Sequence, residues 1–190
     1  MNQHVIAVVG MTNAGKTEFS KLVQEKEFSY FRMGDITEEK IREAGLVNNE
    51  ENNKMMRGRL RQDYGQGAYA ILNMPKIRSL LEKGPVVIDG LYSWDEYKIF
   101  KKEMPEMKTV AVYAPPEVRY KRAESREGRN MKNFHEGHPV KERDYVEIEK
   151  SDKGGPIAMA DYTIMNHLEK EQLDQEFEKF WRWITDGKET

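Results

Sequence analysis

Apolar residues along this chain gather into five short runs, and the stretches between them have helical periodicity. Continuous apolar runs of this length predict buried strands, and the helical stretches between them imply right-handed crossovers between parallel strands. The predicted fold is therefore α/β, a three-layer α/β/α sandwich whose five-stranded parallel sheet is covered on both faces. The runs occupy residues 5–9, 28–31, 86–88, 109–113 and 161–166.

The stretches between the strands predict the helices. Ser93 and Glu96 form an S-x-x-E capping box that starts one of them. Residues 46–83 have helical propensity, and Pro75 is expected to break or kink this stretch. Other helices are expected near residues 18–27, 37–44, 116–126 and 140–150, with a loop at 151–155. The closing helix carries a core-facing stripe of Leu173, Phe177, Phe180, Trp181 and Ile184.

Composition narrows the class of protein. The 190 residues are 38% apolar and 34% charged with a net charge of −2, which indicates a single globular domain over 1–190. This balance gives no sign of nucleic-acid binding. The absence of cysteine excludes disulfides, thiolate metal sites and cysteine nucleophiles. Apolar runs stay too short for a membrane span and no signal peptide is recognisable, so a cytoplasmic protein is expected.

A glycine-rich segment follows the first predicted strand and matches G-x-x-x-x-G-K-[ST] at every required position. In this pattern the backbone N–H groups of the loop and of the following helix face one centre, where they bind phosphates. Lys16 is expected to reach the β and γ phosphates of ATP, and the Thr17 hydroxyl to ligate Mg²⁺. The phosphate-binding residues are expected to be Gly10, Asn13, Ala14, Gly15, Lys16, Thr17 and Glu18.

Two carboxylates follow other predicted strands. Asp89 ends the third run and is expected to share the Mg²⁺ ion of Thr17, directly or through water; its alternative role is to cap the turn at Gly90. Asp35 follows the second run, where it is expected to accept a proton from an acceptor hydroxyl. Its alternative role is to cap the helix that begins near Thr37.

Basic residues concentrate late in the chain, with eight basic and four acidic side chains between Arg119 and Arg143. Arg122 and Arg126 lie one helical turn apart, so they share a face and are expected to neutralise the transferring phosphoryl group beneath a lid at about 127–150. The alternative is a solvated helix face with ordinary ion pairs. Arg143 is expected either at the substrate or in an ion pair with its neighbours Glu142 and Asp144.

The helical region at about 36–83 is expected to bind the acceptor. Arg57, Arg59 and Arg61 cannot share one helix face, and Arg61 is the one assigned to the acceptor side. His135 and His138 form an H-x-x-H pair without the carboxylate or thiol that would make a convincing metal site.

These motifs resemble P-loop small-molecule kinases, specifically adenylate kinases and dephospho-coenzyme A kinases. Gly34-Asp35 is similar to the start of the adenylate kinase acceptor site and to the position of the aspartate base in dephospho-coenzyme A kinases. Asp89-Gly90 is similar to the strand-end pair of adenylate kinases. Residues 119–126 and 160–166 resemble the lid opening and the penultimate motif of dephospho-coenzyme A kinases. The resemblance implies a P-loop NTPase fold with a small helical lid, with Gly34, Asp35 and Gly90 at the acceptor.

A group of functionally unassigned, mostly archaeal adenylate-kinase-like proteins is still more similar in its pattern of Glu142-Arg143-Asp144 and Gly154-Gly155. One departure from adenylate kinases matters. They place an arginine shortly after the aspartate-glycine pair to hold the acceptor phosphate, whereas residues 91–94 contain none. This favours an acceptor hydroxyl, or an unusual acceptor, over a simple nucleoside monophosphate.

The sequence therefore favours an ATP- and Mg²⁺-dependent kinase that acts on a nucleotide-like small molecule, with no nucleic-acid or membrane partner. An alternative is an ATP-binding regulatory protein that hydrolyses ATP slowly or not at all. A GTPase is disfavoured, because the chain lacks the guanine-reading N-K-x-D motif.

Overall fold

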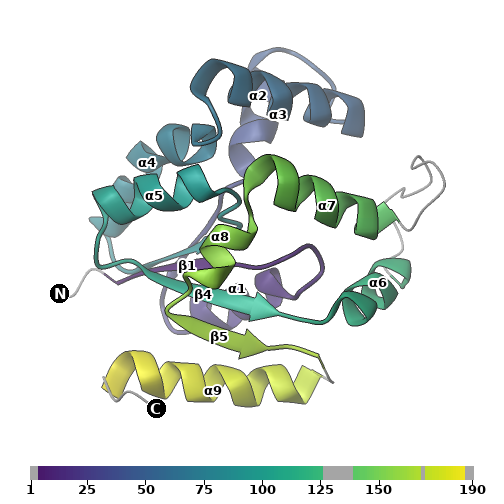
Figure 1. Ribbon diagram of the computed structural model, residues 1–190. Coiled ribbons are helices and arrows are strands. Elements are labelled where there is room, and N and C mark those ends of the chain that lie inside the picture. The colour runs from purple at the N-terminus through teal and green to yellow at the C-terminus, as the bar shows by residue number, and fades with distance from the viewer. Residues whose placement is uncertain (1–3, 126–138, 168–169, 187–190) are drawn as a thin grey trace.

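The computed structural model describes residues 4–125, 139–167 and 170–186. Its centre is a parallel sheet of five strands in the order β2-β3-β1-β4-β5 (Figure 1). The predicted α/β class and the five parallel strands are confirmed. The strands are β1 (Val5–Val9), β2 (Ser29–Arg32), β3 (Val86–Asp89), β4 (Lys108–Tyr113) and β5 (Tyr162–Met165).

Helices fill the stretches between the strands. Within the described residues, none is both long and apolar enough to span a membrane. They are α1 (Lys16–Gln24), α2 (Asp35–Glu43), α3 (Glu50–Tyr64), α4 (Ala68–Leu81), α5 (Trp94–Glu103), α6 (Pro116–Glu124), α7 (Pro139–Ser151), α8 (Gly154–Ala158) and α9 (Lys170–Asp186).

Alternation along β1 produces the two cores. Val5, Ala7 and Val9 face a core shared with α2 to α5, whereas Ile6 and Val8 face a core shared with α1 and α9. Figure 1 shows α9 beneath the sheet and α4 and α5 on its other side. The stripe predicted for the closing helix is confirmed, since all five of its residues pack into the second core.

Two expectations about the helices are corrected. A break at Pro75 is wrong, because Pro75 lies inside α4 and does not end it, whereas the alternative of a kink there stays a prediction. Pro75 and Ile71, whose carbonyl loses its helical partner, are both on the exposed side, where that carbonyl can accept from solvent instead. The break falls instead at residues 65–67, where a Cβ at Gly67 would lie 2.4 Å from Cδ1 of Ile99 in α5, so that a side chain there would require Ile99 to move. The loop expected at 151–155 also contains the first residues of α8.

The capping box of α5 is confirmed, and its Glu96 is fully buried. Burial raises the pKa of Glu96 to about 7, although the N–H groups of Tyr92 and Ser93 and the charges of Arg61 and Lys153 act to lower it. A carboxyl whose pKa is raised on folding stabilises the fold below its ordinary pKa of 4.5, and this contribution is lost as the pH rises through 7.

We therefore predict that Glu96→Gln removes a pH dependence of stability. Between pH 5 and pH 8 the wild-type protein should lose up to about 3 kcal/mol of unfolding free energy relative to the variant. Urea denaturation of both proteins at the two pH values measures this difference. Parallel pH profiles for the two proteins would contradict the assigned pKa.

Candidate functional site

The glycine-rich loop runs from the end of β1 into the first turn of α1. Gly10 has a φ of +142° and Gly15, the N-cap of α1, a φ of +101°. A Cβ at Gly10 would lie 2.3 Å from the carbonyl oxygen of Val112, and one at Gly15 would lie 2.1 Å from Nδ2 of Asn166. No side chain caps this helix. The loop therefore has the tight, glycine-dependent geometry in which backbone N–H groups at a helix start bind phosphate.

Thr17 and Asp89 meet at the edge of this loop, as the sequence predicts. The Thr17 hydroxyl donates to Oδ2 of Asp89 at 2.9 Å, and the Tyr30 hydroxyl donates to the same oxygen at 2.8 Å. Asp89 is only 4% exposed. A hydroxyl and a carboxylate are the hard oxygen donors that Mg²⁺ prefers, and Mg²⁺ usually takes few protein ligands beside substrate phosphates. This pair fits such an ion, while no cluster of three acidic or histidine side chains occurs among the described residues.

The Lys16 ammonium group lies over the loop and donates to the carbonyl oxygen of Met11 at 3.0 Å. Burial, followed by the charge of Lys153, lowers the pKa of Lys16 to about 7, although Asp89 and Glu147 act to raise it. Two lysine ammonium groups thus share one poorly solvated space beside the loop. Such a space favours an anion.

Helix α7 contributes a carboxylate to the loop. Glu147 accepts from the Thr12 hydroxyl at 3.0 Å, from Nε of Arg143 at 2.9 Å and from Nζ of Lys153 at 2.5 Å. Although burial acts to raise the pKa of Glu147, Lys153 and Arg143 lower it to about 2, so this side chain is a carboxylate at neutral pH. Arg143 also donates to the Tyr92 hydroxyl at 3.3 Å, and the Lys153 ammonium lies 4.2 Å from the Tyr92 ring centre.

A buried ion pair fixes α7 against α6. Arg119 makes a two-point contact with Asp144, at 2.8 Å and 2.7 Å, and donates to the carbonyl oxygen of Thr12 at 3.3 Å. Its side chain and that of Asp144 are almost completely buried. Arg143 therefore pairs neither with Glu142 nor with Asp144, the neighbours considered from the sequence; its carboxylate partner is Glu147, one turn along the helix.

Arg122, one of the predicted phosphate-binding arginines, lies at the far side of the loop. It donates to the backbone oxygen of Asn166 at 3.1 Å and to its Oδ1 at 3.2 Å. Asn166 in turn donates to the carbonyl oxygen of Ala14 at 2.8 Å. Arg122 is thus connected to the phosphate loop through the residue that follows β5. Arg126, His135 and His138 lie outside the described residues, as does the first half of the predicted lid.

Gly34 and Asp35 lie beside Asp89-Gly90, because Arg32 of β2 is paired with Asp89 of β3. Asp35 is the first residue of α2, and its Oδ1 lies 3.3 Å from Nη1 of Arg32. The Asp35 side chain is exposed. The N-cap of α2 is Gly34, and no side chain caps this helix, so the alternative in which Asp35 is the cap is wrong. Partial burial raises the pKa of Asp35, against the opposing charge of Arg32.

The three arginines of α3 diverge, as their spacing predicts. Arg57 pairs with Glu50 and Arg59 with Asp63, whereas Arg61 turns inward over the Tyr69 ring, 5.6 Å from its centre. Arg61 also has a buried Nε without a hydrogen-bond partner in the described structure. Arg61 is therefore the member of the set that faces the protein interior.

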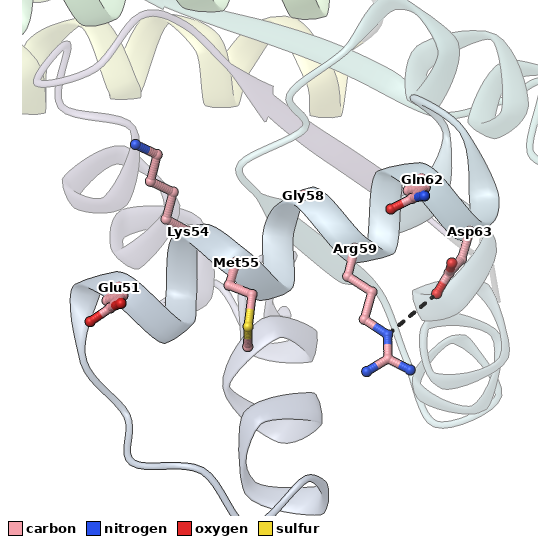
Figure 2. A pocket seen from close by; sticks show the side chains of 7 residues that line it. All are labelled: Glu51, Lys54, Met55, Gly58, Arg59, Gln62 and Asp63. Atoms are coloured by element: carbon pink, nitrogen blue, oxygen red, sulfur yellow. Dashed lines mark ion pairs between the residues drawn. The ribbon is translucent and has the colours of Figure 1, made fainter.

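A surface hollow lies along α3 (Figure 2). All of its lining residues are exposed and come from this one helix, so it is a one-sided hollow rather than an enclosed site. It includes no residue of the phosphate loop. The lining residues are Glu51, Lys54, Met55, Gly58, Arg59, Gln62 and Asp63.

Sequence reasoning located the loop, Asp89 and Arg143 but missed the residues that α7 and its C-terminal end bring to them. Lys153 is 1% exposed in spite of its charge, and a one-dimensional pattern gives no sign of this. The other residues that sequence reasoning missed are Thr12, Tyr30, Tyr92 and Glu147. Arg119, Asp144 and Asn166 belong to the motifs that carry the family resemblance, and that resemblance is the signal that could have assigned them to the site.

Comparisons with known proteins agree with this geometry. The family model described as an AAA domain matches residues 6–150. A UPF0200 protein from Thermococcus gammatolerans is 37% identical over 174 residues, which cover 90% of each chain. The chain belongs to the UPF0200 family. This confirms the resemblance to an unassigned archaeal family, whose members' names state no activity.

Solved structures show the same fold at low sequence identity. Dephospho-CoA kinase from Campylobacter jejuni superposes with a TM-score of 0.59 at 16% identity, covering 96% of this chain and 98% of that one. Shikimate kinase from Acinetobacter baumannii, in complex with shikimate, has a TM-score of 0.57 at 17% identity and covers 98% and 95%. The UPF0200 chain therefore has a P-loop kinase-like fold.

Proposed function

We propose that this protein is a kinase that uses ATP and Mg²⁺ to phosphorylate a nucleotide-like small molecule. The contact between Thr17 and Asp89, 2.9 Å long at the mouth of the glycine-rich loop, carries the proposal. This contact supports the proposal because a hydroxyl and a carboxylate beside a phosphate loop are the groups that would hold the Mg²⁺ ion of a nucleotide. The P-loop kinase-like fold supports the same reaction class.

In such a reaction the protein positions the two substrates and neutralises the negative charge of the phosphates. Loop amides and Lys16 would hold the β and γ phosphates, and Thr17 and Asp89 would hold the metal ion. When bound, Mg²⁺ neutralises charge on the phosphates. Arg122 is proposed to act from the opposite side of the loop. Arg126, which lies outside the described residues, is proposed for the same role on the strength of its sequence spacing alone.

The acceptor is proposed to bind beside Gly34, Asp35 and Gly90, with Arg61 on the helical side. Its hydroxyl oxygen forms a bond to the γ-phosphorus, the bond from that phosphorus to the bridging oxygen breaks, and ADP leaves. Asp35 accepts the hydroxyl proton, and a raised pKa makes its carboxylate a stronger base. Its ion pair with Arg32 would have to loosen for this step.

An ADP-release assay tests the proposal. Purified protein is incubated with MgATP and, separately, with dephospho-coenzyme A, nucleoside monophosphates and nucleosides. At least one acceptor should raise ADP release above the basal hydrolysis rate. If MgATP binds and no acceptor in these classes raises turnover, the protein is better described as an ATP-binding regulator.

A further prediction concerns the base. With a hydroxyl acceptor, Asp35→Asn should lower kcat by about 10²–10⁴-fold and leave the affinity for MgATP unchanged, because only proton transfer is affected. Glu38→Gln is the matched control, since Glu38 also pairs with Arg32 from the same helix. Steady-state kinetics of both variants separate the two roles. An unchanged kcat in Asp35→Asn would rule out Asp35 as the base.

A further inference from the structure

Glu147 is surrounded by the kinds of donor group that bind a phosphate. Its carboxylate is held by a hydroxyl of the phosphate loop, by a guanidinium group and by a buried ammonium group, which come from Thr12, Arg143 and Lys153. Hydroxyl, guanidinium and ammonium groups are the side-chain donors that bind phosphate oxygens. Figure 1 shows α7, which carries Glu147, alongside the loop between β1 and α1.

The charge around Glu147 is not balanced by that carboxylate alone. Lys153 and Arg143 both pair with it, and the neighbouring Lys16 lies close enough for Lys153 to depress its pKa. Asp89 is the other nearby carboxylate, and its Oδ2 accepts from Thr17 and Tyr30. Two carboxylates, Glu147 and Asp89, therefore face three cationic groups, whereas a phosphate group brings up to two negative charges to the same place.

Burial also sets Lys153 apart from an ordinary ion pair. Its side chain is 1% exposed, and lysine is almost never fully buried unless it is paired. Replacing such a pair with apolar side chains is often neutral or stabilising, so stability alone gives little reason for it. A site that must hold an anion does give a reason, and it requires that Glu147 leaves when the anion arrives.

We propose that Thr12, Arg143 and Lys153 form a phosphate-binding site beside the glycine-rich loop, and that Glu147 is its internal occupant, which an incoming phosphate group displaces. The inference deepens the proposed function and rests on it for the source of the phosphate. Arg143 and Lys153 also bring positive charge to Tyr92, which lies in the segment after Asp89-Gly90 that has no arginine of its own.

Binding measurements on Glu147→Gln test this site without requiring turnover. The amide keeps the shape of the side chain and removes the charge that competes with phosphate. Isothermal titration should show tripolyphosphate and MgATP binding at least about tenfold more tightly to the variant than to the wild-type protein, equivalent to 1.4 kcal/mol. The double variant Glu147→Gln/Lys153→Gln should lose this gain. If Glu147 only fastens α7, the single variant will bind both ligands equally or more weakly, which would overturn the inference.

Different nucleotides show which phosphate enters the site. A gain for ATP but not for ADP assigns it to the γ-phosphate, and a gain for AMP in the presence of ADP assigns it to a phosphate on the acceptor. Glu149→Gln, an exposed glutamate of the same helix, is the matched control and should change neither affinity.

A measurement on the wild-type protein covers the case in which the variant does not fold. The side-chain carboxyl ¹³C resonance of Glu147 should move when tripolyphosphate is added, and a resonance that stays in place at saturation would overturn the inference.

The kinase proposal and the displacement proposal can fail separately. If tripolyphosphate displaces Glu147 but MgATP does not bind, the kinase proposal fails alone; if MgATP binds and Glu147→Gln gives no gain, the displacement proposal fails alone.

Discussion

Lys16→Met is expected to lower kcat with the best acceptor by about 10²–10³-fold. This is the usual loss when one preorganised hydrogen-bond donor to the charge that develops in the transition state is removed. Lys16 is the cation that the loop itself contributes, and it lies over the loop with its ammonium group on the Met11 carbonyl oxygen. Partial burial already disfavours its charged form in the ligand-free protein. Removing that charge should therefore leave the unfolding temperature unchanged or slightly higher, so the loss of activity cannot be attributed to unfolding.

The matched control for this experiment is Lys21→Met in the same helix. Lys21 is exposed and forms a surface ion pair with Glu18, and such pairs contribute between about 0 and 1 kcal/mol. ADP release and MgATP titration on both variants separate a phosphate contact from a general effect of lost charge. If Lys16→Met turns over acceptor at the wild-type rate, the glycine-rich loop is not the site of transfer.

Gly10→Ala should destabilise the fold strongly, whatever the protein binds. An alanine there must adopt a φ of +142° and place its Cβ 2.3 Å from the carbonyl oxygen of Val112 in the neighbouring strand. Backbone strain of about 1–3 kcal/mol adds to overpacking of about 1–3 kcal/mol, so the expected loss is roughly 2–6 kcal/mol. The unfolding temperature should fall by roughly 5–20 °C.

Gly58→Ala is the control, because Gly58 lies within α3 and a Cβ there meets nothing within 4 Å. Alanine is the better helix former, so this variant should gain about 0.5–1 kcal/mol. Thermal unfolding followed by circular dichroism compares the two. Equal stability of Gly10→Ala and the wild-type protein would mean that the loop does not have the backbone conformation described above.

The sequence by itself determined the layers of the fold and the position of the phosphate loop. Both depend on local patterns: a run such as Val5–Val9 is apolar enough to be buried on both faces, and Gly10 to Thr17 is a contiguous motif whose backbone shape follows from its glycines. Asp89 was also predictable, because carboxyl ends of parallel strands meet at one edge of the sheet.

Tertiary structure alone decided the partners of the charged residues. From the sequence, Arg143 is expected either at the substrate or paired with a neighbouring carboxylate, but the choice of Glu147 over those neighbours depends on which face of α7 meets the loop. Pro75 fails to break α4 because its position is exposed, and exposure is a property of packing. Lys153 becomes a buried cation only because Glu147 and Tyr92 enclose it. Side chains far apart in the chain share no periodicity, so no pattern along the sequence records that they meet.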